Sequence, residues 1–154
     1  VVTAWVAISD ASLDTGPMEV IPKSHKWDNL EHKETFNEKN LLTRGQELNI
    51  KISEHNTTPM PLKPGEISLH HVKLAHSSRI NKTNDRRIGI AIRYTTPQVK
   101  QTKADKEKDT ALLVRGKDQF MNFNHEILPN FNINKETILN HKITSANHHK
   151  ILMK

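Results

Sequence analysis

Residues His70–Tyr94 read HHVKLAHSSRINKTNDRRIGIAIRY, and the order of residue types in this stretch decides how the chain is expected to fold. The segment Asn81–Asp85 (NKTND) is made of residues that favour turns, and an alternating apolar run follows it. We therefore predict two antiparallel strands joined by this turn. His76, before the turn, and Arg87, after it, would then lie near each other on neighbouring strands.

The strand predicted over Arg87–Thr95 has two very different faces. Side chains alternate along a strand, so one face carries only bulky apolar groups, namely Ile88, Ile90, Ile92 and Tyr94. The other face combines two arginines with two small residues, namely Arg87, Gly89, Ala91 and Arg93. The small residues leave space that an anionic ligand would fill. The alternative is an edge strand whose arginine face is simply solvated.

Several other short segments favour strands. They are Val1–Ser9, Met18–Ile21, Glu47–Ile52 and Ile67–His71, and turn signals such as Asp14–Pro17 and Leu62–Glu66 separate them. Both faces of the first segment are largely apolar, which predicts burial on both sides. Ser24–Asn40 is expected to be a long loop with a helical turn, and His55–Pro61 a loop. Short strands separated by turns are typical of an all-β sandwich or barrel.

The chain changes character after Pro97. Gln98–Asp109 is a charged run that reads as a linker or an exposed helix, and Asn122–Lys154 is rich in Asn, Lys and His. We expect this tail to be irregular or partly helical, with one marginal helix. The prediction is thus a β domain over residues 1–97 and a polar C-terminal extension of the same domain over residues 98–154.

Composition excludes several classes of protein. The 154 residues fit one domain, and the formal net charge of +6 comes from lysines that are spread along the chain. Aromatic residues make up only 5%, so we expect no nucleic-acid binding. The chain has no cysteine, which excludes disulfides and thiolate metal sites. It contains no run of about 18 apolar residues, so no membrane span is expected.

The start of the sequence bears on what kind of chain this is. It begins VVTAWVAISD, without Met and inside a predicted strand, and we expect a C-terminal part of a longer protein. No targeting segment is visible, so a cytoplasmic location is expected.

Several segments, in this order, resemble a known family. They are Val2–Ala7 (VTAWVA), Thr15–Pro17 with the following Pro22–His25 (PKSH), Leu62–Glu66 (LKPGE), and Ala75–Ser78 (AHSS) with Asn81 and Arg87. Together they resemble the phytanoyl-CoA dioxygenase-like family of Fe(II)/2-oxoglutarate oxygenases. The resemblance covers residues 1–97. It implies a double-stranded β-helix, the cupin-like jelly-roll barrel, here without its N-terminal portion.

The resemblance also implies roles for individual residues. His76 would be the distal Fe(II) ligand, and Arg87 would bind the far carboxylate of the cosubstrate 2-oxoglutarate. Ser78 would add a hydroxyl to that carboxylate, and Trp5 would form a wall of the cofactor pocket. Arg93 shares the face of Arg87 and is a candidate substrate contact; no catalytic residue is expected beyond the metal site.

Arg86 is the rival of Arg87 as the anion anchor, because the two are neighbours in the chain. Alternation places Arg86 on the apolar face of the strand, and the family spacing favours Arg87. The expected reaction is the hydroxylation of a small organic substrate by O2, with 2-oxoglutarate decarboxylated to succinate.

The first metal motif of the family, His-x-Asp, is absent from this sequence. His25–Asp28 (HKWD) does not replace it, because its spacing is one residue too long. Lys23 and Ser77 stand where the family usually has glycine. The 154-residue chain alone is therefore expected to be inactive. His70 and His71 are read as one exposed and one satisfied core histidine, rather than as zinc ligands together with His76.

Three other functions stay open at this point. A related non-haem iron halogenase has a small residue in place of the Asp of the first metal motif. A non-catalytic jelly-roll binding module, or pseudoenzyme, would lack the metal site. The basic charge leaves a nucleic-acid-binding fragment as the third alternative.

Overall fold

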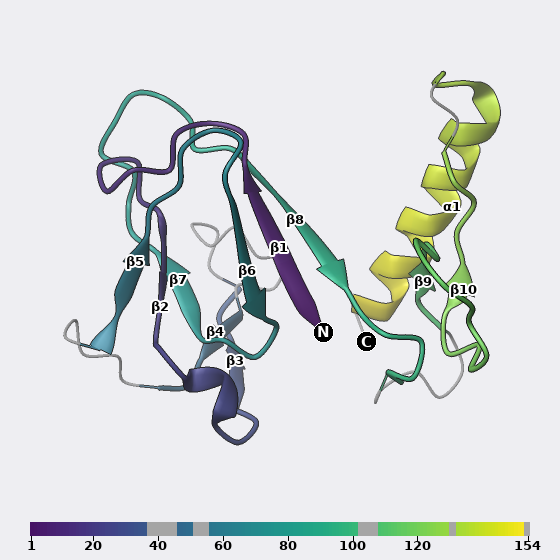
Figure 1. The fold of residues 1–154 in the computed structure, drawn as a ribbon, viewed down its shortest axis with the longest axis horizontal. Helices are drawn as coiled ribbons and strands as arrows, with labels where there is room; N and C mark the ends of the chain where they lie inside the picture. The colour runs from purple at the N-terminus through teal and green to yellow at the C-terminus, as the bar shows by residue number, and fades with distance from the viewer. Residues whose placement is uncertain (37–45, 51–55, 102–107, 130–131, 153–154) are drawn as a thin grey trace. The chain divides into compact units, whose positions relative to one another are not determined.

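The computed structural model describes residues 1–36, 46–50, 56–101, 108–129 and 132–152. These fall into two compact units, Val1–Tyr94 and Thr95–Lys154. In chain order the elements are β1 (Val2–Ala7), β2 (Met18–Val20), the 3-10 turn η1 (Ser24–Lys26), β3 (His32–Glu34), β4 (Gln46–Leu48), β5 (Thr58–Met60), β6 (Ile67–His71), β7 (His76–Ser78), β8 (Gly89–Tyr94), β9 (Thr110–Ala111), β10 (Asn124–His125) and α1 (Lys135–Leu152) (Figure 1).

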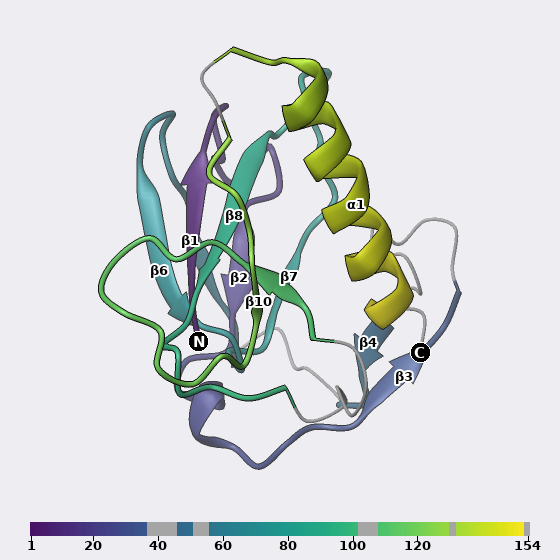
Figure 2. The same cartoon turned by 90° about the vertical axis from the view of Figure 1, so that its right-hand side faces the viewer.

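The first sheet of unit 1 has the strand order β6–β1–β8, and both pairings are antiparallel. Figures 1 and 2 show β1 between its two neighbours. Thr3 in β1 lies opposite His70 on one side and Arg93 on the other, while Trp5 lies opposite Ser68 and Ala91. These side chains share one face, because residues two apart point the same way. The strands predicted over 1–9, 67–71 and 87–95 are therefore confirmed to within two residues at each end.

The second sheet of unit 1 has the order β5–β2–β7, again antiparallel. Val20 lies opposite His76, and Met18 lies opposite Ser78 on one side and Met60 on the other. The prediction of a loop over residues 55–61 is wrong for Thr58–Met60, which form β5. Pro59 lacks the N–H that a central strand needs, but β5 is an edge strand, where proline is tolerated.

The sheet pairing expected around the turn at 81–85 is also wrong. His76 begins β7 in the second sheet, whereas Arg87 lies two residues before β8 in the first sheet. The two residues therefore come from different sheets and are not neighbours on a hairpin. Asn81 shapes the connection, since its Nδ2 donates to the Asp85 carbonyl at 2.8 Å and its Oδ1 accepts from the Thr83 N–H at 2.8 Å.

Ser24 fixes the position at which β7 begins. Its Oγ accepts a hydrogen bond from the Ala75 N–H at 2.9 Å, and the side chain is only 1% exposed. The Ile21 N–H donates to the Ala75 carbonyl at 3.0 Å. Both backbone groups of Ala75 are thus held by the segment that follows β2. The next residue, His76, therefore starts from a fixed backbone.

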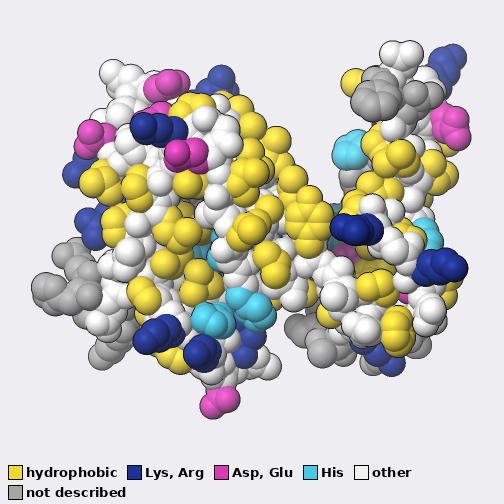
Figure 3. Space-filling model, in the orientation of Figure 1, with side chains coloured by type: hydrophobic (Ala, Val, Ile, Leu, Met, Phe, Trp, Pro, Cys, Tyr) yellow, Lys and Arg dark blue, Asp and Glu magenta, His cyan; other side chains and the backbone are white. Residues whose placement is uncertain are grey.

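The core of unit 1 is small, and one face of its first sheet is open. The buried apolar residues are Ala4, Ala7, Ala11, Met18, Val20, Ile21 and Ala75. The apolar face predicted for β8 is exposed along its length, and Val2, Ile8, Ile67 and Leu69 extend it across β1 and β6. Figure 3 shows these strands covered by hydrophobic side chains. The expected burial of β1 on both sides holds in part: Thr3, Ala4 and Ala7 are buried and Trp5 and Val6 half-buried, whereas Val2 is exposed.

The smaller elements of the first unit match the sequence less closely. β3 and β4 form an antiparallel pair, so the expected long loop over Ser24–Asn40 contains both η1 and a strand. The strand expected over Glu47–Ile52 appears as β4. Residues 51 and 52 of that prediction lie outside the described ranges.

Unit 2 pairs two short parallel strands, β9 and β10, and contains the long helix α1. Asn134 caps the start of this helix, because its Oδ1 accepts from the Thr137 N–H at 2.8 Å. The helix expected in the C-terminal tail is thus confirmed. Residues 102–107 of the charged run 98–109 lie outside the described residues, and its character as a linker or an exposed helix stays a prediction.

The domain boundary expected at residue 97 lies three residues beyond the end of unit 1. Whether unit 2 is an extension of the same domain stays a prediction. In the described part of the chain, no helix has the length and apolarity needed to cross a membrane.

Candidate functional site

A cavity of about 290 Å³ opens on the inward face of the first sheet of unit 1. Side chains from both sheets line it, and they are Thr3, Trp5, Met18, His70, Val72, His76, Ser78, Arg87, Ala91 and Arg93. All five residues that the sequence singled out lie here, because alternation along β1, β7 and β8 directs them to one side. Among these lining residues there are two arginines and two histidines but no acid.

The imidazole of His76 is oriented by the backbone beside it. Its Nδ1 lies 2.8 Å from the Leu74 carbonyl oxygen. A carbonyl can only accept a hydrogen bond, so Nδ1 carries a proton, and in the neutral ring Nε2 keeps its lone pair. This is the tautomer that a metal-ligating histidine needs, with its second nitrogen held by a backbone acceptor.

Arg87 reaches into the cavity from the first sheet. One of its terminal nitrogens donates to the Ser78 Oγ at 3.3 Å, and its Cζ lies 5.5 Å from the centre of the Trp5 ring. A guanidinium over an indole face is a favourable cation–π arrangement. The hydroxyl and the guanidinium thus converge from two sheets, with the indole as a wall beside them.

Gly89 makes room for the Trp5 ring. A Cβ atom built on Gly89 would lie 2.1 Å from Cζ2 of Trp5, far closer than two carbon atoms can approach. The small residues noted on this face of β8 therefore have a packing role, since they leave space for the indole beneath Arg87.

Arg86 does not line the cavity. Its backbone carbonyl accepts from the Ser9 Oγ at 2.9 Å, and the same Oγ accepts from the Ile88 N–H at 2.7 Å. Ser9 thereby fixes the backbone on both sides of Arg87. Of the two neighbouring arginines, Arg87 is the one that faces the cavity.

His70 is a functional candidate that the sequence interpretation missed. Its ring centre lies 5.8 Å from that of His76, and its Nδ1 is buried without a hydrogen-bond partner in the described part of the chain. Burial, and then the proximity of His76, hold the pKa of His70 below its ordinary value, which favours the neutral imidazole. The expectation of a satisfied core histidine is therefore wrong. The available signal was its alternation with Ser68 on the inward face of β6.

The described residues do not form a complete metal site. They contain no cluster of three or more His, Asp or Glu side chains that could hold a metal ion. The ring of His71 lies on the other face of β6, 5.8 Å from that of His25, so a zinc site with His70 and His76 is not formed. His76 with its free Nε2 can serve as one ligand of a metal, beside cations suited to an anionic cosubstrate.

The sequence profile of the phytanoyl-CoA dioxygenase (PhyH) family matches residues 1–89, which is more than half of the chain. The chain belongs to the phytanoyl-CoA dioxygenase family. The matched residues include β1 to β7, the turn that follows β7 and the residue Arg87, and they end at the first residue of β8. No curated protein matches the sequence.

Solved structures agree with membership of the PhyH family. A non-heme monooxygenase, ThoJ in its apo form, is 30% identical, with a TM-score of 0.81 over 97% of this chain. A ThoJ–Ni complex, also described as a non-heme monooxygenase, is 26% identical, with a TM-score of 0.73 over 98% of this chain. This PhyH chain spans about half the length of those proteins, 52% and 51% respectively. The expected family and the mainly β fold are therefore confirmed.

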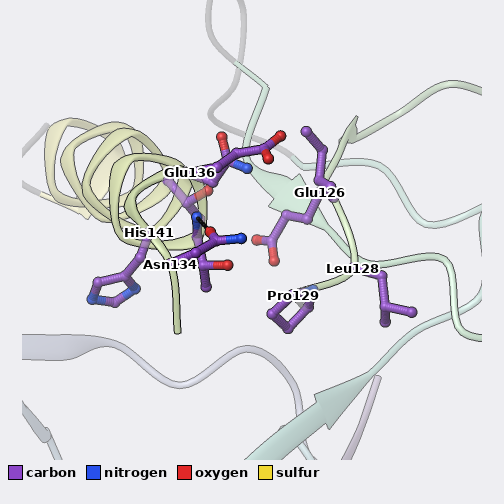
Figure 4. A pocket seen from close by; sticks show the side chains of 10 residues that line it. Glu126, Leu128, Pro129, Asn134, Glu136 and His141 are labelled. Atoms are coloured by element: carbon purple, nitrogen blue, oxygen red, sulfur yellow. Dashed lines mark hydrogen bonds between the residues drawn. The ribbon is translucent and has the colours of Figure 1, made fainter. Parts of the chain in front are cut away.

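A larger cavity lies in unit 2 of this PhyH-family chain. It has a volume of about 630 Å³ and lies between α1 and the segment that follows β10. Figure 4 shows Glu126 and Asn134 pointing toward one another across it. Glu126 is held by the Thr110 Oγ1, which donates to it at 2.6 Å. None of the residues that the family resemblance places at iron or 2-oxoglutarate lines this cavity.

Proposed function

We propose that this protein is an Fe(II)- and 2-oxoglutarate-dependent dioxygenase that hydroxylates a small organic substrate. The observation that carries the proposal is one cavity that holds both an imidazole with a free Nε2 and an arginine aligned with a hydroxyl. These are the groups needed for a metal and for a dicarboxylate. The membership in the PhyH family and the similarity to a non-heme monooxygenase support it.

His76 would supply one ligand of the iron. Its Nε2 is available because Nδ1 is committed to the Leu74 carbonyl, and Ser24 holds the adjoining backbone. Bound Fe(II) would supply the activation of O2 that drives the oxidative decarboxylation of 2-oxoglutarate and the hydroxylation. The role of His76 is to hold the metal in place with a ring that cannot rotate freely.

Arg87 and Ser78 would bind the far carboxylate of 2-oxoglutarate. The guanidinium can give two parallel N–H donors to a carboxylate, and the Ser78 hydroxyl can turn to donate once an acceptor arrives. Trp5 keeps bulk water from one side of this ion pair and supports the guanidinium through its ring face. The chain's own residues thus bind, orient and partly desolvate the cosubstrate.

The remaining iron ligands would come from residues other than those the structure describes. The family resemblance places a His-x-Asp motif ahead of the strand that carries Trp5. One imidazole exchanges only one water of an aqueous Fe(II) ion, so His76 alone gives little affinity. The 154-residue chain by itself should therefore show no tight iron site and no turnover.

The test compares the 154-residue chain with the full-length natural protein. Calorimetry under anaerobic conditions would measure the binding of Mn(II), an inert substitute for Fe(II), and then of 2-oxoglutarate. We expect both to bind the full-length protein only, and His76→Ala to abolish metal binding together with succinate formation. Micromolar Mn(II) binding by the short chain would contradict this, because it would require a different site.

Two other outcomes would replace the proposal. A full-length protein that binds neither Mn(II) nor 2-oxoglutarate would be a non-catalytic binding module. A product that gains chlorine instead of oxygen would identify a halogenase.

A further inference from the structure

The cavity has a second cationic region, away from the Arg87–Ser78 pair. Thr3, His70 and Arg93 lie abreast on β1, β6 and β8, because Thr3 is the register partner of both other residues. All three side chains line the cavity. We define them as the polar row. Arg87 and Arg93 are six residues apart along an extended chain, about 20 Å between their Cα atoms.

The polar row has unused hydrogen-bonding capacity. The Nδ1 of His70 is buried and has no hydrogen-bond partner among the residues that the structure describes. Arg93 takes part in none of the ion pairs of the described residues, and no acidic side chain is among the described residues that line the cavity. A buried nitrogen without a partner is costly unless a ligand or water satisfies it, while Arg93, which is exposed, leaves its donors available to a ligand.

We propose that the polar row binds an anionic group, a carboxylate or a phosphate, of the substrate. This inference rests on the proposed function, because it takes 2-oxoglutarate to occupy Arg87 and Ser78. The Arg93 guanidinium offers a planar pair of donors, the Thr3 hydroxyl a third, and a His70 ring nitrogen a fourth. Arg93 is the arginine of the cavity lining that lies in the polar row, since Arg87 is at the other end of the cavity.

The position of the polar row suits a substrate site. The His70 ring lies 5.8 Å from the ring of His76, the residue assigned to the metal. A substrate held by its anionic group at this row would have its neighbouring carbon atoms beside His76. Holding a substrate in place next to the reacting centre is a large part of what an oxygenase must do. The volume of about 290 Å³ limits the bound part to a compact group.

The experiment uses the full-length protein with Mn(II) and saturating 2-oxoglutarate, which fills the Arg87 end. The probes are hexanoate, propyl phosphate and the neutral hexanamide, and the readout is the fluorescence of Trp5. Trp27, and any tryptophan outside these 154 residues, is replaced by phenylalanine in every protein. We expect both anions, and not the amide, to change the emission in a saturable way.

The variants separate the polar row from the cosubstrate site. Arg93→Gln should weaken anion binding roughly ten- to a hundred-fold and leave 2-oxoglutarate affinity unchanged. Arg93→Lys should restore part of the anion affinity. His70→Phe should lose less anion affinity than Arg93→Gln. Arg86→Gln, which removes the same charge outside the cavity, is the matched control and should have no effect.

Each result decides between the two proposals. Anion binding that is absent, equal to that of hexanamide, or unchanged by Arg93→Gln would overturn the polar row. A loss of 2-oxoglutarate affinity in Arg93→Gln would also overturn it, because the row would then belong to the cosubstrate. Anion binding that depends on Arg93 in a protein without affinity for 2-oxoglutarate would support the row and refute the oxygenase proposal.

Discussion

Arg87 and Arg86 are adjacent and identical in chemistry, yet their surroundings differ. Arg87 lies against Trp5 and donates to Ser78, whereas Arg86 lies outside the cavity. We therefore expect Arg87→Ala to weaken 2-oxoglutarate binding by the full-length protein roughly ten- to a hundred-fold, the worth of a charge-assisted bidentate contact. Calorimetry on Arg86→Ala provides the control, with little change expected. Equal losses in both variants would contradict the assignment.

Gly89 is the second residue on which the cavity depends. In Gly89→Ala the new methyl group would overlap the Trp5 ring, so the ring must move. We expect a loss of about 1–3 kcal/mol in the free energy of unfolding, typical of overpacking, and a shifted tryptophan emission. Chemical denaturation measures the first effect.

The compensating variant for Gly89 is a double substitution. Gly89→Ala with Trp5→Phe replaces the indole by a smaller ring and should recover part of the lost stability. If the double variant is less stable than Gly89→Ala alone, the overlap with Trp5 is not the cause.

Asp118 holds a turn in unit 2. Its carboxylate lies 2.9 Å from the Nε2 of His125 and accepts the N–H groups of Phe120 and Met121 at 2.9 and 3.0 Å. The hydrogen bond to His125, followed by the two backbone donors, lowers the pKa of Asp118 below its ordinary value of 3.8. Its contribution to stability is therefore complete above pH 3.8 and is lost as the pH falls through the lowered pKa.

The expected behaviour of Asp118→Asn follows from this pH dependence of the stability that Asp118 contributes. The variant should melt at a lower temperature than the natural chain at neutral pH. The difference should shrink in strongly acidic solution, where the natural carboxyl is protonated as well. Thermal unfolding followed by the helical circular dichroism of α1 measures this. A difference that stays constant from neutral to strongly acidic pH would argue against the carboxylate as the cause.

At the scale of elements, the outer face of the β6–β1–β8 sheet is the least protected part of unit 1. Ile90 is 52% exposed, Ile92 41% and Leu69 71%. An apolar surface of this extent on a sheet favours self-association. We expect the 154-residue chain to bind a hydrophobic dye and to elute as larger species in size-exclusion chromatography.

Charged substitutions on that face test the cause. Ile90→Lys with Ile92→Lys should reduce both dye fluorescence and association without loss of strand content, because the side chains are already exposed. The matched control is Ala4→Lys, which changes a buried position on the same face and should unfold the sheet. A natural chain that is monodisperse and does not bind the dye would contradict the prediction.

Alternation predicted the long strands well and the short ones poorly. β1, β6 and β8 have five or six residues each, enough for a period of two to be visible. β5 and β7 have three residues each, and their pairing with β2 determines them. His70 was missed for the same reason. Its inward direction is a property of β6, but its lack of a partner depends on what the other sheet places opposite it.

At the scale of the whole molecule, the ordered motifs of residues 1–97 predicted the family. The structure brings His76, Arg87, Ser78, Trp5 and Arg93 to one cavity, and their roles there stay predictions. Sequence could not show that the cavity is formed between two sheets, since pairing of distant strands depends on contacts that no local pattern encodes. It also could not show which apolar residues of the first sheet would be exposed, since Ile90 and Leu69 are exposed while Ala4 beside them is buried. Both depend on which elements are present to pack against them.

The central place of β1 has a consequence for synthesis on the ribosome. This strand is made before its two hydrogen-bonding neighbours, β6 and β8, which follow only after dozens of further residues. Until Tyr94 has left the exit tunnel, β1 cannot complete its pairing with β8. Such late, long-range pairing is slow and prone to aggregation. The cavity beside Trp5 should thus form only after β8 has emerged, and chaperones that bind nascent chains have that interval in which to act on β1.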